Sequence, residues 1–215
     1  MDVNCGCPID LVNKKGAGCA LLTKPQRLFD ITESMSKVLK VPLTVKVRMG
    51  TAWGSSNPVN SQCGGDRWPG LVAHRLIPRM PQYGITAVTV HGRTQKQRYS
   101  KAADWSYVGA CVEAATSLRW SGDGDNDDVH RRFPVIGSGD CMSWTDYHTN
   151  RSQSGVDTVM LARGVLVKPW LCTEIKQRRH WDISATERLD IVKSFCEMGL
   201  EHWGSDSRGV AMTRM

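Results

Sequence analysis

Short runs of apolar, mostly β-branched residues recur along the chain and alternate with segments of helical periodicity. A first run covers residues 1–5, and longer ones cover residues 42–48, 85–91, 133–137 and 156–162. Each has the length and composition of a strand that is buried on both faces. Alternation of such strands with helices is typical of a parallel sheet that is either closed as a barrel or doubly wound.

Helical patterns lie between these runs. A helix over residues 25–40 would begin with a proline in its first turn. Its apolar stripe is formed by Leu28, Ile31, Met35, Val38 and Leu39. Asp104 has the position of an N-cap for a second helix, and Ser143 for a third that ends near Gly155. A capping-box pattern at residues 184–187 precedes a long helix that we expect to end at Trp203.

Two polar stretches interrupt this alternation. Residues 51–70 are rich in Gly, Ser, Asn and Pro, and residues 117–132 contain an acidic run, so we interpret both as surface insertions. We predict an α/β unit over residues 1–183 and the start of a separate helical region over residues 184–215.

Composition and charge narrow the class of protein. The chain has 215 residues, of which 40% are apolar, which is enough for one domain with a small appendage. Lys and Arg total 28 against 21 Asp and Glu, and the net charge of +7 favours a polyanionic partner, although this indication is weak by itself. The sequence begins without the basic and apolar pattern of a signal peptide, and no run approaches the roughly 20 apolar residues of a membrane span. We therefore expect a cytoplasmic or nuclear protein with no membrane partner.

The cysteines and acidic residues do not follow a metal-binding pattern. The eight cysteines are irregularly spaced and several lie in apolar runs, which favours reduced thiols over a disulfide framework. Cys5 and Cys7 form a Cys-x-Cys pair, but zinc sites usually need a second pair. The acidic run resembles a calcium loop, yet the twelfth position from Asp123 is Pro134 where a Glu is needed. We predict no metal site.

Polar residues follow the predicted strands at the ends where a βα-barrel gathers its reactive groups. In chain order they are Cys7, then Lys46 and Arg48, then His91, then Ser138, Gly139 and Asp140, and finally Arg163 and Gly164. All five strands have such residues at this end, which favours one shared mouth.

The loops after the last two strands have the composition of an anion site. Gly137, Ser138 and Gly139 are small enough for backbone amides to approach an anion, and Arg163 adds a guanidinium. Loops at this position of a barrel often hold a ligand phosphate. Taken singly, the glycines suit turns and Arg163 suits a surface ion pair, but the combination favours the phosphate.

Three further side chains are candidates for chemistry. Lys46 has apolar neighbours in its strand and would be a fixed cation beside an electron-accepting ring or a developing anion, unless it extends to solvent. His91 suits a cofactor contact, an acid or a structural role. Cys7 lies in a turn between Gly6 and a proline, so we expect its thiol at the mouth as the catalytic group, with Cys5 packed in the core.

Several linked motifs resemble the successive signatures of tRNA-dihydrouridine synthases. They are Asp2-x-Asn4-x-Gly6-Cys7-Pro8, Lys14-Lys15-Gly16-Ala17-Gly18-Cys19-Ala20-Leu21, Val45-Lys46-Val47-Arg48, His91-Gly92-Arg93-Thr94, Gly137-Ser138-Gly139-Asp140 and Ala162-Arg163-Gly164. The resemblance runs from residue 1 to about residue 214, apart from the two insertions. Residues 4–10 and 168–184 most resemble the eukaryotic type that acts at uridine 47 of tRNA.

The resemblance implies a TIM (β/α)8 barrel that binds flavin mononucleotide (FMN), with NADPH as reductant and tRNA as substrate. In this chemistry the flavin delivers hydride to C6 of a flipped-out uracil, and a cysteine, here Cys7, protonates C5. The implied flavin contacts are Lys46, His91, Ser138, Gly139, Asp140, Ala162 and Arg163. The implied substrate contacts are Asn4, Lys14, Arg48 and Arg93. The family usually has Asn at the position of Ser138.

The sequence differs from a whole barrel in extent. A complete barrel takes about 250 residues, and the five predicted strands correspond to the family's fourth to eighth. We expect an open sheet of this kind to aggregate or to need partner strands. Two alternatives to the enzyme stay open: an inactive remnant that binds RNA or a partner chain, and another FMN barrel such as a dihydroorotate dehydrogenase. The basic charge and the Cys7 turn favour tRNA.

Overall fold

The computed structural model describes residues 1–51, 68, 70–116 and 132–213. The chain divides into two compact units, Met1–Arg178 and Arg179–Met215, which are described separately. The two predicted insertions lie almost wholly outside the described residues.

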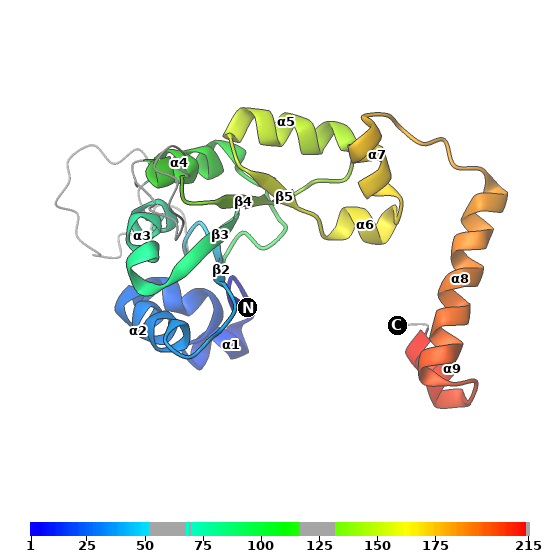
Figure 1. The fold of residues 1–215 in the computed structure, drawn as a ribbon, viewed down its shortest axis with the longest axis horizontal. Helices are drawn as coiled ribbons and strands as arrows, with labels where there is room; N and C mark the ends of the chain where they lie inside the picture. The colour runs from blue at the N-terminus through cyan, green and yellow to red at the C-terminus, as the bar shows by residue number, and fades with distance from the viewer. Residues whose placement is uncertain (52–67, 69, 117–131, 214–215) are drawn as a thin grey trace. The chain divides into compact units, whose positions relative to one another are not determined.

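The first unit is built on a five-stranded parallel sheet (Figure 1). Its strands are β1 (Asp2–Cys5), β2 (Leu43–Arg48), β3 (Ile85–His91), β4 (Val135–Ser138) and β5 (Thr158–Met160). They pair in the order in which they occur in the chain, so each strand lies beside its predecessor. The predicted five parallel strands are confirmed, and the order is that of consecutive βα units in a barrel.

Helices connect the strands and follow one another around one side of the sheet (Figure 1). The longer ones are α2 (Pro25–Ser36), α4 (Trp105–Thr116) and α5 (Trp144–Ser154). The shorter ones are α1 (Asp10–Lys14), α3 (Ala73–Leu76), α6 (Arg163–Val167), α7 (Leu171–Gln177) and the 3₁₀ helices η1 (Gly18–Thr23) and η2 (Ile77–Tyr83). These short helices contain too few turns for periodicity to predict them.

The predicted helix starts are confirmed. The Asp104 carboxylate accepts a hydrogen bond from the N–H of Tyr107 (3.0 Å) at the start of α4. Ser143 forms a capping box with Asp146, and α5 ends at Gly155 in the left-handed conformation (φ 70°). Each cap satisfies backbone groups that a helix end otherwise leaves unpaired.

The helix predicted over residues 25–40 is shorter than expected, because α2 ends at Ser36. Val38, which the periodic pattern places on the apolar stripe, is 78% exposed. The chain must turn here to enter β2 at Leu43, and the residue before Pro42 is disfavoured in a helical conformation. The predicted helix therefore extended four residues too far toward β2.

The two faces of the sheet differ. One face contributes the valines Val45, Val47, Val88, Val90 and Val135 to the core, where they pack with side chains of α2 and α4. The pairing of Val47 with Val90 and of Lys46 with Thr89 leaves polar residues on the opposite face. The prediction that every strand is buried on both faces was wrong. The edge strands show this most clearly, since β5 buries only its central residue and β1 exposes Asp2 and Asn4.

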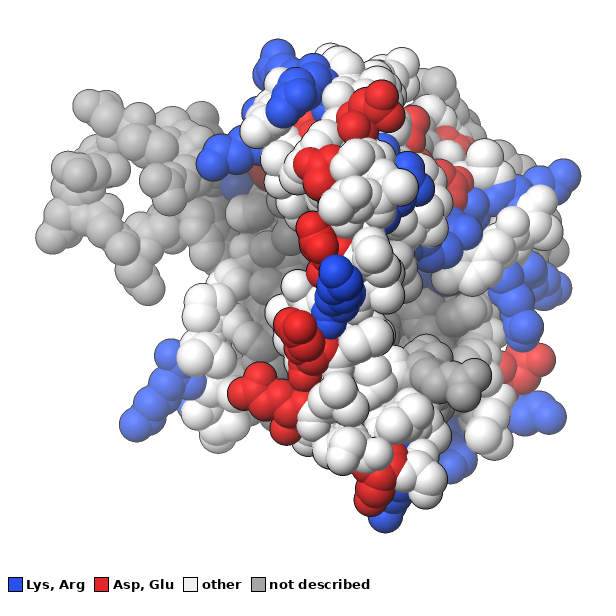
Figure 2. Space-filling view, turned by 90° about the vertical axis from the view of Figure 1, so that its right-hand side faces the viewer, with Lys and Arg blue, Asp and Glu red and all other residues white. Residues whose placement is uncertain are grey.

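The second unit contains α8 (Ala185–Trp203) and α9 (Ser207–Thr213). The predicted capping box between Ser184 and Glu187 is present, and α8 ends before Gly204 as expected. Figure 2, viewed from the right-hand side of Figure 1, shows acidic and basic side chains interspersed with uncharged surface on this side. No helix among the described residues is long and apolar enough to cross a membrane.

Candidate functional site

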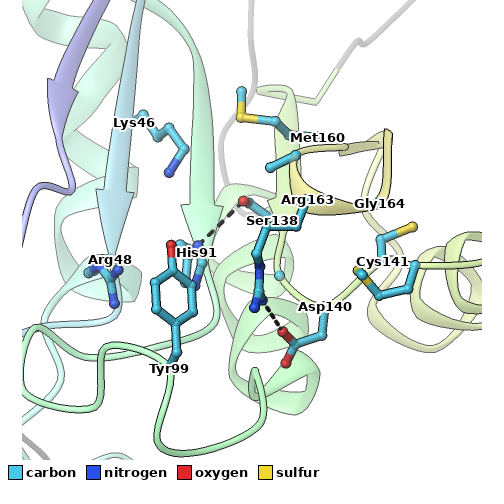
Figure 3. Close-up of a pocket in the computed structure, with 13 residues that line it drawn as sticks. Lys46, Arg48, His91, Tyr99, Ser138, Asp140, Cys141, Met160, Arg163 and Gly164 are labelled. Atoms are coloured by element: carbon cyan, nitrogen blue, oxygen red, sulfur yellow. Dashed lines mark hydrogen bonds and ion pairs between the residues drawn. The ribbon is translucent and has the colours of Figure 1, made fainter. Parts of the chain in front are cut away.

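A pocket opens at the carboxyl ends of β2 to β5 (Figure 3). Eight of the predicted site residues line it, namely Lys46, Arg48, His91, Ser138, Gly139, Asp140, Ala162 and Arg163. The cavity has a volume of about 170 Å³, below the roughly 300–1,000 Å³ of typical small-molecule pockets. The described residues therefore enclose only part of a ligand of that size.

The strand ends give the pocket a positively charged wall. Lys46 and Arg48 come from alternate positions of β2 and therefore project from the same face. Burial lowers the pKa of the Lys46 ammonium, and the nearby Arg48 guanidinium lowers it further. A site with this donor set favours an anionic ligand, because an anion would offset the repulsion between the cations.

His91 is neutral in this environment. Burial lowers the pKa of its imidazole to about 3, and the positive charges of Arg48, Lys46 and Arg93 act in the same direction. Arg93 Nη1 lies 3.4 Å from His91 Nε2, and Ser138 Oγ lies 3.4 Å from His91 Nδ1. Because a guanidinium only donates, Nε2 accepts and the proton belongs on Nδ1, which donates to Ser138.

Arg48 joins two loops at the rim of the pocket. Its side chain is buried, with Nε donating to the carbonyl of Gly6 and Nη1 to the carbonyl of Thr94, both at 2.9 Å. Gly6 precedes the predicted catalytic cysteine, and Thr94 lies in the loop between β3 and α4. Arg48 thus fixes the cysteine loop relative to the pocket, in addition to lining it.

Asp140 holds two arginines together. Its carboxylate accepts from Arg93 Nη2 (2.6 Å), Arg163 Nη2 (2.8 Å) and the backbone N–H of Ala103 (2.7 Å). Burial alone would raise the pKa of Asp140, but the Ala103 hydrogen bond and the two guanidiniums outweigh it and keep the pKa below its ordinary value. The carboxylate of Asp140 therefore holds the guanidinium of Arg163 at the pocket, which Asp140 itself also lines.

The glycines after β4 and β5 allow close packing of the loops. A Cβ at Gly139, whose φ is 143°, would collide with the side chain of Ala103, and one at Gly164 would collide with the carbonyl of Cys141. The space that a side chain would need is therefore filled by protein. These glycines line the pocket as predicted, but the reason for glycine is the contact between neighbouring loops.

The cysteine loop lies beside the pocket. Cys7 is half-buried after β1 and is not among the residues that line the cavity. Its carbonyl accepts from Asn13 Nδ2 and from the N–H of Cys19, both at 3.1 Å, while Asn4 Oδ1 accepts from the N–H of Gly6 at 3.0 Å. These hydrogen bonds hold the backbone of the turn in place and thereby position the residue that carries the thiol.

Two other thiols near this loop are less accessible. Cys5 is fully buried, as predicted, and burial raises its pKa to about 12. Cys19 is also buried, and burial raises its pKa to about 11. Cys7 is half-buried and is the most accessible of the three, which suits contact with a substrate.

The remaining predicted contacts lie outside the pocket wall. Asn4 and Lys14 lie on the segment from β1 to α1, and both are exposed. Arg93 is buried behind the wall, where Nε donates to the carbonyl of Lys101 (2.7 Å). The structure thus separates a charged cavity from a neighbouring group around Cys7.

Sequence reasoning missed four residues that line the cavity: Tyr99, Cys141, Met142 and Met160. Met160 could have been predicted, because it is the last residue of β5 and pairs with Ser138. Tyr99 had a weaker signal, as an aromatic residue within the basic stretch of residues 96–101.

The fold and the pocket define a parallel α/β protein with a cationic site at the carboxyl ends of its strands. The sequence model of the family described as "Dihydrouridine synthase (Dus)" matches residues 1–214, and the chain belongs to this family. The family has the TIM-barrel fold, and the five-stranded sheet is consistent with part of such a barrel.

Curated relatives match the whole chain. It is 47% identical over 215 residues to "tRNA-dihydrouridine(47) synthase [NAD(P)(+)]-like" of Homo sapiens, covering 100% of the chain and 28% of the relative. It is 49% identical over 217 residues to "tRNA-dihydrouridine(47) synthase [NAD(P)(+)]" of Cryptococcus neoformans, covering 100% of the chain and 27% of the relative. The chain therefore spans somewhat more than a quarter of the length of these relatives.

Proposed function

We propose that the protein containing this chain reduces uridine to 5,6-dihydrouridine in tRNA, at position 47, with FMN as cofactor and NADPH as reductant. Family membership and the names of the relatives support the reaction and the substrate. The observation that carries the proposal is the cationic pocket at the strand ends, which is lined by Lys46, Arg48 and Arg163 together with a neutral His91.

The residues of the pocket fit FMN by the chemistry of their donors. Arg163 and the Ser138 hydroxyl suit the phosphate, while Lys46 and His91 suit the polar edge of a flavin ring. FMN supplies the transfer of two electrons as hydride when it is bound. The cavity of about 170 Å³ is too small to enclose FMN, which fits a site that contacts only part of the cofactor.

Each protein group then has a defined task. Lys46 places a positive charge where negative charge increases during reduction, which stabilises the transition state. His91 accepts from Arg93 and donates to Ser138 from a fixed tautomer, so it adds no charge of its own. Arg163 and Ser138 bind and orient the phosphate.

Cys7 is the proposed proton donor to C5 of the uracil. Its loop is fixed by Arg48 and Asn13, and Cys7 is not among the residues that line the cavity, a position that supports a role toward the substrate rather than the cofactor. A positioned proton donor typically contributes about 10²–10⁴-fold to a rate.

The test compares two cysteine variants of the full protein, loaded with FMN and supplied with NADPH. Dihydrouridine is measured in a tRNA transcript with uridine at position 47 and in one with cytidine there. We expect Cys7→Ala to reduce the rate by at least about 10²-fold. Cys172→Ala, which removes an exposed thiol on α7, should leave the rate unchanged. Full activity in Cys7→Ala would refute the proton-donor assignment, and a protein that binds no flavin would favour a non-catalytic role.

A further inference from the structure

Tyr99 makes an unusual contact for an exposed aromatic residue. It lies in the loop between β3 and α4 and is 63% exposed. Its ring nevertheless faces two guanidiniums, with Cζ of Arg163 4.5 Å from the ring centroid and Cζ of Arg93 5.5 Å from it. Figure 3 shows the ring at the mouth of the pocket, between the residues of β2 and those that follow β4.

Arg163 depends on few other contacts. Its side chain is 49% exposed, and within the described part of the chain it makes one ion pair, from Nη2 to Asp140 Oδ1 at 2.8 Å. A single ion pair at one nitrogen leaves a long side chain free to rotate about that contact. The ring of Tyr99 adds a second contact on the flat face of the guanidinium, so the two partners together restrict its orientation.

The loop itself holds Tyr99 in place. Arg48 donates to the carbonyl of Thr94, and the N–H of Thr94 donates to Gln97 Oε1 at 2.8 Å. On the other side, the N–H of Ser100 donates to the carbonyl of Gln97 at 2.8 Å. The loop that carries Tyr99 is therefore hydrogen-bonded to β2 through Arg48 and is stabilised by hydrogen bonds among its own residues.

We propose that Tyr99 is a positioning residue that holds the guanidinium of Arg163 in the pocket for the phosphate of the bound nucleotide. The inference rests on the proposed flavin function of the same pocket. Asp140 pairs with one edge of the guanidinium and Tyr99 covers its face, which leaves Nη1 and Nε for an anion. The hydroxyl of Tyr99 has no part in this role, since the contact is made by the ring.

The test uses two flavins that differ in the phosphate. Dissociation constants of FMN and riboflavin are measured by the change in flavin fluorescence for the full protein and for Tyr99→Leu, Tyr99→Phe and Arg163→Met. Tyr99→Leu should weaken FMN about 2- to 5-fold, the factor given by a cation–π contact of about 0.5–1 kcal/mol. Riboflavin affinity should not change. Tyr99→Phe should retain the wild-type FMN affinity, because the ring remains.

Further variants separate this role from general effects. Arg163→Met should weaken FMN more than Tyr99→Leu does, and the double variant should be no weaker than Arg163→Met alone. Lys96→Met removes an exposed charge from the same loop and serves as the control for charge alone. Equal losses for FMN and riboflavin, or no loss for either, would overturn the positioning role. A wild-type protein that binds neither flavin would instead refute the proposed function, and the inference with it.

Discussion

The two faces of the parallel sheet are made by alternate residues of the same strands, yet one face is apolar and buried whereas the other is charged and lines the pocket. In β2, Val45 and Val47 are fully buried against the helices, whereas Lys46 and Arg48 face the pocket. Burial of apolar area stabilises the first face, at roughly 25 cal/mol per Å². The second face concentrates positive charge, which costs stability unless an anion offsets it. Stability and ligand binding are therefore assigned to opposite sides of one strand.

The strongest test of this division places a charge on the apolar face. In Val47→Asp a carboxylate without a partner would be buried among the side chains of the core, so we expect loss of folding, on the order of the roughly 5–15 kcal/mol that stabilises a domain. Circular dichroism and denaturant unfolding measure this. Val38→Asp, at an exposed position next to α2, is the control and should unfold like the wild type. A folded Val47→Asp protein would contradict the assignment of this face to the core.

The opposite substitution removes a charge from the pocket face. Lys46→Met should leave the unfolding free energy unchanged or raise it by about 1 kcal/mol, since burial disfavours the ammonium. The rate of the proposed uridine reduction should fall by about 10²-fold, the typical effect of one lost electrostatic contact in the transition state. Lys24→Met, exposed at the start of α2, should alter neither quantity. Loss of folding in Lys46→Met would show that the lysine has a structural role.

The sequence predicted the strands, the helix caps and the strand-end residues better than the contacts between loops, and the structure shows why. Apolar runs and capping residues such as Ser143 are local signals that do not depend on distant contacts, and the five strands and the helix caps were predicted correctly, whereas burial of every strand on both faces was not. The residues at the strand ends were also predictable, because parallel strands bring their carboxyl ends together. The partners of Asp140 were not, since Arg93 and Ala103 reach it through a loop whose path has no periodic pattern. Tyr99 was missed for the same reason.

A third test uses pH. Burial lowers the pKa of His91 from its ordinary value near 6.5 to about 3, so between these values the unfolded chain binds more protons than the folded one. Stability is therefore complete above about pH 6.5 and falls as the pH decreases toward 3. The groups that face His91 are Lys46, Arg48, Arg93, Ser138 and Asp140. Asp140 stays ionised above its ordinary pKa, so it does not contribute between pH 5 and 7.5.

We expect the unfolding free energy to decrease by about 1–2 kcal/mol between pH 7.5 and pH 5 because of His91. Urea denaturation at both pH values measures the decrease. His91→Asn should reduce the decrease by that amount, whereas His202→Asn, at an exposed position on α8, should not. An unchanged pH dependence in His91→Asn would mean that the imidazole is not buried in its neutral form.

The smallest expected effects come from two serines that lie five positions apart and serve opposite functions. Ser143 caps α5, so Ser143→Ala should lower the unfolding free energy by about 1 kcal/mol and leave FMN affinity unchanged. Ser138 lines the pocket, and among the described residues its hydroxyl has a single hydrogen-bond contact, at 3.4 Å to His91. Ser138→Ala should therefore weaken FMN about 2- to 5-fold, as expected for one hydrogen bond, with little effect on unfolding. Denaturant unfolding gives the free energy of unfolding of each variant, and flavin titration gives its affinity for FMN. If both substitutions changed only the unfolding free energy, or only the FMN affinity, the assignment of Ser143 to stability and of Ser138 to binding would be wrong.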